Sequence, residues 1–188
     1  MNTTRKLLQP SQKAGFTLVE LLVTTAITSI ILLTASVILM TFFLSNTRTN
    51  IRRQLKSEGA RASARIEFVA RGAQSCSDTA GNTDITFTNL DNSTVRIWFA
   101  ENFDWGGGVI VDTIRMTTTP SGGTGTTEEL LSQFAQVQNV LFDCVRETVD
   151  GQPANKLYAN IRFELANPGT TANIMESFST LAVLRNSE

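Results

Sequence analysis

The stretch "KAGFTLVELLVTTAITSIILLTASVILMTFF", residues 13–43, determines how the chain is organised. From Phe16 to Ser45 the only formal charge is Glu20. An apolar run of about 18 residues or more is long enough to cross a bilayer as a helix. We therefore predict a transmembrane helix over residues 16–45. Its many Thr, Ser and Ala residues allow close helix packing, and the hydroxyls can bond to carbonyls of the same helix.

The segment before the apolar run is basic and ends in two small residues. Arg5, Lys6 and Lys13 carry its charge, and Ala14 and Gly15 directly precede the run. A secretory signal has its cut site after an apolar core of about 7–15 residues, whereas here the core is longer and the small residues come first. A cut after Gly15 would remove residues 1–15 and leave the membrane helix intact.

Gly15 followed by "FTLVE", residues 16–20, resembles the leader junction of type IV pilin-like proteins. The resemblance implies that a prepilin peptidase cleaves between Gly15 and Phe16 and that the new amine of Phe16 is methylated. It also implies an inner-membrane anchor that later packs into a filament core. The implied partners are the prepilin peptidase/methyltransferase, the inner-membrane assembly platform, the membrane before assembly, and other pilin or pseudopilin subunits.

Glu20 is an unusual residue for this position. A carboxylate at the middle of a bilayer costs roughly 2.5–3.5 kcal/mol on insertion scales, and less near the interface. In a filament core the nearest available cation is the freed Phe16 amine, and two unit charges about 4 Å apart attract by roughly 4 kcal/mol at an effective dielectric of 20. We predict that Glu20 pairs with a Phe16 amine, its own or a neighbour's, during assembly. The alternative is an interfacial carboxylate without a partner.

Charge is strongly segregated along the chain, although the formal net charge is only −1. The net charge is +3 over residues 1–15, −1 over 16–45, +5 over 46–75 and −8 over 76–188. The basic residues after Ser45 either form a solvated surface or face the acidic heads of neighbours. By the positive-inside rule alone, residues 76–188 would be cytoplasmic. The leader motif implies the opposite, a single-pass inner-membrane protein whose head lies outside the cytoplasm and later joins an extracellular or periplasmic filament.

The predicted fold class is α+β, a long N-terminal helix packed against an antiparallel β-sheet head, as in pilins. No proline interrupts residues 11–119, and apolar residues recur on one helix face at Leu44, Ile51, Leu55, Ala62, Ile66, Val69 and Ala73. We therefore expect an amphipathic helix over 46–75 that ends near Gly72, and a globular β-rich head over 76–188. Alternating patterns predict two strands in 84–99 and one each in 107–119, 137–147, 156–166 and 178–185. A short helix is predicted over 128–134, with loops at 119–127, 149–155 and 166–173.

The side chains with reactive chemistry are few. The chain has no histidine, which removes the commonest general base and the commonest metal ligand. Cys76 and Cys144 match no metal-binding spacing, and an isolated pair in an exported domain indicates a disulfide, with two buried thiols as the alternative. We predict no catalytic residues, no metal and no cofactor. Residues 105–108, "WGGG", are expected to form a hairpin loop rather than a phosphate loop.

Three functional classes follow from these features. The favoured one is a non-catalytic minor pilin or pseudopilin, because the strand-rich head and the ending "TLAVLRNSE" look similar to W-type minor pilins and J-type pseudopilins. Glu20 favours a place in the initiating tip complex or the shaft over the terminal cap. Whether the machine is a pilus, a competence pilus or a type II secretion system stays open.

The second class is an adhesive or DNA-capturing pilin, and the third, least favoured, is a membrane-tethered enzyme. A head with a net charge of −8 is a poor partner for DNA, so nucleic acid is not expected, although a local patch at Arg96, Arg115 or Arg162 is possible in principle. For Trp98, Phe99, Phe103 and Trp105, core packing is favoured over a binding patch.

Overall fold

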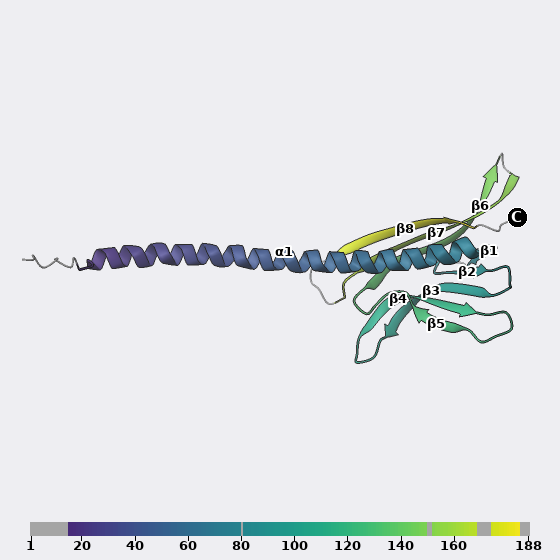
Figure 1. Ribbon diagram of the computed structural model, residues 1–188, viewed down its shortest axis with the longest axis horizontal. Helices are drawn as coiled ribbons and strands as arrows, with labels where there is room; N and C mark the ends of the chain where they lie inside the picture. Colours follow the sequence, from purple (N-terminus) through teal and green to yellow (C-terminus); the bar gives the residue numbers. More distant parts are fainter. Residues whose placement is uncertain (1–14, 80, 150–151, 169–173, 185–188) are drawn as a thin grey trace, which may run out of the picture. The chain divides into compact units, whose positions relative to one another are not determined.

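The computed structural model describes residues 15–79, 81–149, 152–168 and 174–184, and the predicted leader lies almost wholly outside this range (Figure 1). The chain divides into two compact units, residues 1–46 and 47–188. One α-helix and two antiparallel sheets confirm the predicted α+β class and its pilin-like architecture. The elements are α1 Leu18–Gly72, β1 Ser75–Asp78, β2 Asp84–Thr88, β3 Thr94–Asp104, β4 Ile110–Thr119, β5 Thr126–Glu129, β6 Gln136–Val149, β7 Gln152–Ala166 and β8 Met175–Val183.

Helix α1 is 55 residues long and ends at Gly72, as predicted. Its buried residues all come from the second unit and recur every three or four positions, so they form one face. They are Leu55, Gly59, Ala62, Ile66 and Ala70. Ile51 and Val69 pack at the margin of this face, whereas the side chain of Leu44 is 50% exposed. The predicted apolar face therefore holds from Ile51 onward and does not include Leu44.

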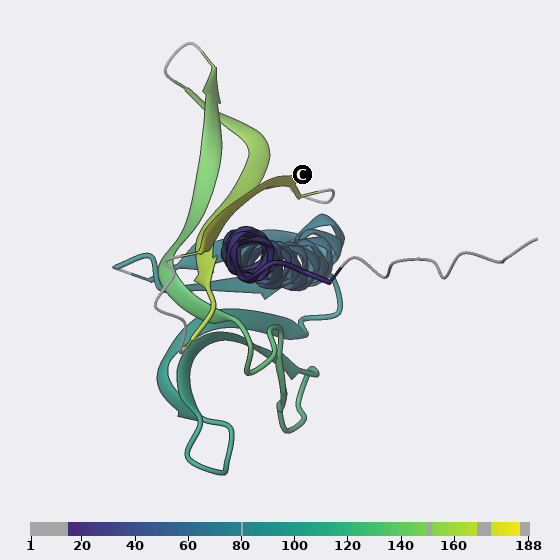
Figure 2. The same ribbon diagram turned by 90° about the vertical axis from the view of Figure 1, so that its left-hand side faces the viewer.

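The strands form two sheets with the orders β1-β2-β3-β4-β5 and β6-β7-β8, and every neighbouring pair is antiparallel. Residues of both sheets share one hydrophobic core with the buried face of α1. Phe87, Ile97 and Ile114 come from the first sheet, and Phe142, Ile161 and Phe163 from the second. Figure 2 shows strands of both sheets curving beside the helix.

The short helix predicted over residues 128–134 is wrong. Glu128 and Glu129 belong to β5 and pair with Met116 and Arg115 of β4, and the amide of Leu130 donates to the carbonyl of Ile114 at 3.0 Å. A seven-residue helix is too short to be stable alone. Extending the sheet instead satisfies these backbone groups and buries Leu130 beside the core.

Two predicted loops are shorter than expected, and two strands, β1 and β5, were missed. Thr126 and Thr127 belong to β5, so the loop predicted over 119–127 ends before Thr126. The loop predicted over 149–155 is shortened from both sides, because β6 ends at Val149 and β7 begins at Gln152. Strand β1 follows the end of α1 almost at once. Residues 80, 150–151, 169–173 and 185–188, which include parts of the predicted loops and the last residue of the predicted final strand, lie outside the described residues.

A disulfide links the two sheets. Cys76 on β1 and Cys144 on β6 are bonded, with their Cα atoms 5.9 Å apart and a sequence separation of 68. In the chain-entropy model a loop of this length stabilises the fold by about 4 kcal/mol. A hydrogen bond from the Phe142 amide of β6 to the carbonyl of Asn82, 2.9 Å, joins the second sheet to the loop between β1 and β2.

At Gly59 the backbone of α1 lies directly against a side chain of the second sheet. Gly59 is buried, and a Cβ placed on it would overlap the ring of Phe178 on β8. That ring is stacked on Phe163, with the centroids 5.2 Å apart and the planes 20° apart. Because the Phe178 ring is held between the helix backbone and a fully buried ring, it has little room to retreat.

A nearly buried carboxylate, Asp84, is held at the start of β2. Its exposed fraction is 6%; Arg96 Nε donates to Oδ2 at 2.9 Å, and the Thr79 hydroxyl donates to Oδ1. Burial by itself raises the pKa of Asp84, but the hydrogen bond from Thr79 and the ion pair with Arg96 outweigh it and hold this pKa below its usual value. The ionised form therefore stabilises the folded head.

Gly59→Ala should lower the free energy of unfolding by about 1–3 kcal/mol, the usual range for overpacking a core. The gain in helix propensity, about 1 kcal/mol, acts in the opposite direction and is already exceeded by the steric conflict. Urea unfolding of the full-length protein in detergent micelles, followed by tryptophan fluorescence, measures the change. Gly72→Ala is the matched control, because a Cβ there meets nothing within 4 Å. A Gly59→Ala protein as stable as this control would contradict the packing described.

The depressed pKa of Asp84 predicts a pH-dependent contribution to stability. Because the folded pKa lies below the unfolded one, the contribution is present above about pH 4 and is lost as the pH falls through the folded pKa. We expect Asp84→Asn to be less stable than wild type at pH 7 and the difference to shrink towards pH 3. Urea midpoints of both proteins across this range test it. A difference that stays constant from pH 7 to pH 3 would show that the carboxylate charge is not responsible.

Candidate processing and assembly site

Residues 15–20 form the junction between the leader and α1. Gly15, Phe16 and Thr17 precede the helix, which begins at Leu18 rather than at Phe16. The amide of Glu20 donates to the hydroxyl of Thr17 at 3.2 Å, and the amide of Leu21 donates to the carbonyl of Thr17 at 3.2 Å. Thr17 is therefore the N-cap of α1, because its hydroxyl satisfies an amide that has no partner within the helix.

Thr17 is the site residue that the sequence analysis missed. The signal was present in the order Thr-x-x-Glu before an apolar run, which is the pattern of a capping box. Glu20 holds the third helical position and is the acidic residue of the first turn, where the helix dipole favours a negative charge. The cap uses the backbone of Glu20 and leaves its carboxylate available for another partner.

The predicted pair between Glu20 and the Phe16 amine is not tested by this structure. In the uncut chain the nitrogen of Phe16 belongs to a peptide bond and carries no charge. The side chain of Phe16 is 77% exposed, and Glu20 is exposed as well. The cleavage position, the methylated residue and the charge pair therefore stay predictions.

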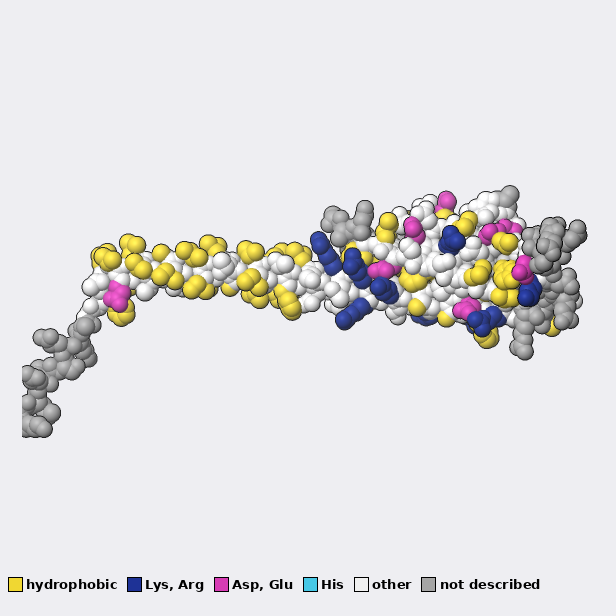
Figure 3. All heavy atoms as spheres, turned by 90° about the horizontal axis from the view of Figure 1, so that it is seen from above, with side chains coloured by type: hydrophobic (Ala, Val, Ile, Leu, Met, Phe, Trp, Pro, Cys, Tyr) yellow, Lys and Arg dark blue, Asp and Glu magenta, His cyan; other side chains and the backbone are white. Residues whose placement is uncertain are grey.

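The apolar part of α1 presents hydrocarbon on all sides. Its large apolar side chains are exposed, and Figure 3 shows them along the visible face of the helix. Its Ser and Thr hydroxyls are satisfied within the helix, since each donates to a carbonyl three or four residues earlier, for example Thr24 to Leu21 at 3.0 Å and Thr28 to Thr24 at 2.7 Å. The others are Thr25, Ser29, Thr34, Ser36 and Thr41. Among the described residues, α1 is the one helix long and apolar enough to cross a membrane.

Two of the three arginines considered as a possible DNA-binding patch, Arg96 and Arg115, lie at the same Trp98 ring, 5.9 and 5.5 Å from its centroid. Arg96 pairs with Asp84, and Arg115 pairs with Glu129 at 2.9 Å. Arg162 lies on β7, in the other sheet. The guanidinium groups of Arg96 and Arg115 therefore already have carboxylate partners.

The four aromatic residues of the head separate into two environments. Phe99 packs against the main core, as predicted. Trp98, Phe103 and Trp105 are half-buried and gather around Arg115, whose guanidinium carbon lies 5.5 Å from the Trp98 ring centroid and 4.5 Å from that of Phe103. Trp105 meets Phe103 edge-on at 5.4 Å. For these three residues the prediction of core packing is replaced by a cation–π cluster outside the main core.

The segment "WGGG" is a hairpin turn, as predicted. The amide of Trp105 donates to the carbonyl of Val109 at 3.0 Å. Gly106, Gly107 and Gly108 have φ values of 88°, 66° and 82°, a left-handed region that glycine adopts most readily. Within the described residues, no group of three or more side chains of His, Cys, Asp or Glu is placed to hold a metal ion.

Comparison with known proteins gives one match, and it falls on the junction described above. Residues 10–36 match the family model described as the prokaryotic N-terminal methylation motif. No curated protein and no solved structure matches the chain. The chain thus carries a type IV pilin-like prepilin leader ahead of a membrane-length apolar helix. Such a leader implies recognition by a prepilin peptidase and association with other pilin subunits, and the helix fits a single-span membrane anchor.

The capping role of Thr17 predicts local fraying when its hydroxyl is removed. In Thr17→Val the first turn of α1 loses about 1 kcal/mol, so the amides of residues 19–21 should exchange with solvent about fivefold faster. Hydrogen-exchange mass spectrometry of the uncut protein in micelles measures this, and Thr17→Ser should exchange like wild type. Thr24→Val is the control within α1, because its hydroxyl serves a carbonyl. Unchanged exchange in Thr17→Val would mean that the cap contributes nothing.

Proposed function

We propose that the protein is a non-catalytic minor pilin or pseudopilin subunit of a type IV pilus-like filament. Prepilin peptidase hydrolyses the peptide bond between Gly15 and Phe16, and the amine released on Phe16 is then methylated. The observation that carries this proposal is the methylation motif at residues 10–36, which contains both residues of the cleavage site. Its position directly before a membrane-length helix supports it further.

The proposal assigns a role to each part of the chain. Residues 1–15 are the leader that is removed. Residues 16–45 are first the membrane anchor and later part of the filament core, and residues 46–75 are the amphipathic extension of the same helix. Residues 76–188 are the head, which lies outside the cytoplasm. The ion pairs Asp84–Arg96 and Arg115–Glu129 join neighbouring strands of the head, which supports a structural rather than a catalytic role.

Cleavage changes the electrostatics of the helix start. Before it, the first turn contains one charge, that of Glu20. After it, a cationic amine lies about one helical turn from this carboxylate. Because the amide of Glu20 is bonded to Thr17, the carboxylate does not have to cap its own helix and is free to meet an amine. In a filament core, where water is excluded, this pairing removes the cost of burying either charge alone.

The subtype and the position in the filament are assigned from three features. The strand-rich head and the C-terminal sequence resemble those of W-type minor pilins and J-type pseudopilins. Glu20 favours a subunit in the initiating tip complex or the shaft. A pilus and a type II secretion pseudopilus are two forms of the same proposal, and the chemistry of the helix start is common to both.

Glu20→Ala should be cleaved normally yet enter filaments at least tenfold less than wild type, since its Phe16 amine would be buried without a counter-charge. Cleavage is followed by the mass of the N-terminal peptide, which should begin at methylated Phe16. Incorporation is followed by the amount of protein in sheared, purified filaments. Glu67→Ala is the matched control, because this acid of the same helix pairs with Arg71 and should be dispensable. Mature protein beginning at Met1 would refute processing, and normal incorporation of Glu20→Ala would refute the charge pair.

A further inference from the structure

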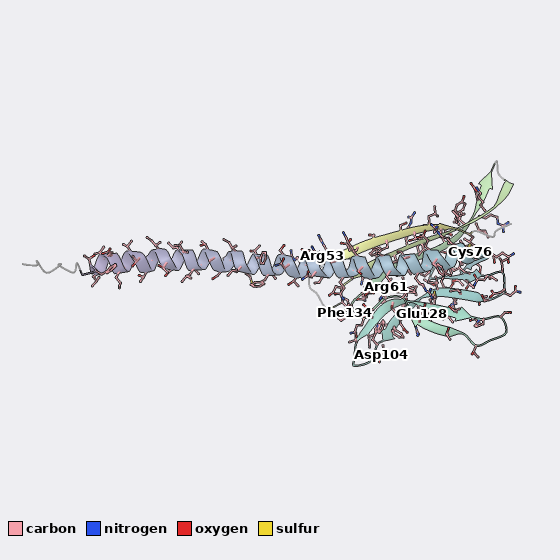
Figure 4. The ribbon with its side chains drawn as sticks, in the orientation of Figure 1. Arg53, Arg61, Cys76, Asp104, Glu128 and Phe134 are labelled. Carbon is pink, nitrogen blue, oxygen red and sulfur yellow. A yellow bond between two sulfur atoms is a disulfide. The ribbon has the colours of Figure 1, made fainter. Side chains whose placement is uncertain are left out.

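The first basic residues after the apolar segment of α1 are three arginines, which we call the basic collar: Arg48, Arg52 and Arg53. Arg48 lies three residues after Ser45, and all three are exposed. At 100° per residue their side chains cover an arc of about 140° of the helix. Figure 3 shows basic side chains grouped where the hydrophobic surface of α1 ends, and Figure 4 labels Arg53 among them.

Among the described residues, the collar differs from the other basic residues of α1 because no ion pair involves it. Arg61 pairs with Glu58 at 2.7 Å, Arg65 with Glu128 at 3.2 Å, and Arg71 with Glu67. Lys56, the next basic residue, lies 3.9 Å from Glu176. No ion pair involves Arg48, Arg52 or Arg53 within the part of the chain that the structure describes.

Helix geometry places the collar at the level of lipid phosphates. From Leu18, where α1 begins, to Arg48 the helix makes 30 steps of 1.5 Å, a length of about 45 Å. A bilayer with its headgroups is about 40–45 Å thick, and membrane helices tilt by about 20° on average. Arginine side chains are long enough to reach back from this height to the headgroups, and a guanidinium group binds two phosphate oxygens at once.

The collar also carries a cost that calls for a function. In the orientation of the proposed function, these charges lie outside the cytoplasm, where basic residues next to a membrane span are disfavoured. Moving each positive charge outward opposes the membrane potential. Solvated glutamines at the same positions would avoid that cost, so the arginines require a partner that uses their charge.

We propose that the basic collar binds anionic phospholipid headgroups at the outer face of the membrane that α1 spans, and so sets the height of the subunit before assembly. The inference rests on the proposed function for its orientation. The other candidate partner is the acidic surface of a neighbouring subunit. Lipid is favoured because the collar directly adjoins the apolar segment, whose far end lies at the membrane surface.

The test uses the purified full-length protein in micelles of an uncharged detergent. Native mass spectrometry counts the phosphatidylglycerol or phosphatidylcholine molecules that it retains during titration. Wild type should retain phosphatidylglycerol in preference, and Arg48→Gln/Arg52→Gln/Arg53→Gln should need at least tenfold more of it. The control variant Arg61→Gln/Arg65→Gln/Arg71→Gln loses the same charge at paired positions. The amount of phosphatidylglycerol that it needs should stay within twofold of the amount that wild type needs. Circular dichroism checks that all variants remain folded.

If both triple variants lost retention of phosphatidylglycerol equally, the effect would depend on net charge alone, and the proposal would be overturned. Retention of phosphatidylglycerol by the collar variant would also overturn it, and in that case failure of this variant to enter filaments would assign the collar to a neighbouring subunit. Release of phosphatidylglycerol by inorganic phosphate at the same concentration as the lipid would show a site for the free ion and would also overturn the proposal. Glu20→Ala should retain lipid like wild type, so a failure of the filament proposal is read separately from a failure of this one.

Discussion

A single carboxylate in a run of apolar residues must remain near water or near a cation, and this constraint links the leader, the helix start and the proposed assembly step. Glu20 lies close enough to the start of α1 to reach the membrane surface while the chain is uncut. The Thr17 hydroxyl caps the first turn through the amide of Glu20, so the local structure is complete without the carboxylate. Cleavage at Gly15 would supply the missing cation within the same turn. The same residue is therefore compatible with the membrane and, in the proposed mechanism, with a filament core.

Helix α1 meets two different environments with one continuous backbone. Over residues 18–44 its large apolar side chains are exposed on all sides, and its hydroxyls are satisfied internally. Over residues 47–72 only one face is buried, and it is made of small or aliphatic residues that let the sheets approach closely. The transition is visible in the sequence as the point within α1 where arginine first appears, at Arg48. Beyond Lys56, the basic residues of the helix are tied to acids of the helix or of β5.

The sequence predicted the features that depend on local periodicity and on composition. The end of α1 at Gly72, the buried face from Ile51 onward and the antiparallel strands follow from the spacing of apolar residues. Residues 128–134 misled the prediction because two glutamates followed by two leucines favour a helix locally, while pairing of β5 with β4 decided the outcome. The division into two sheets depends on contacts between distant strands, which no local pattern contains. At the candidate site the leader resemblance predicted roles for Gly15, Phe16 and Glu20. The capping role of Thr17 was also present in the sequence, as the pattern Thr-x-x-Glu, but was not predicted.

The bond between Cys76 and Cys144 has a mechanical consequence. Strand β1 has four residues and lies at the edge of its sheet, directly after the helix, so tension along α1 reaches a short edge strand next. The covalent link passes that load to β6, a long strand of the other sheet. A pull on the helix must then displace both sheets together and cannot peel β1 away by itself. A subunit built in this way resists unravelling from the end at which force arrives.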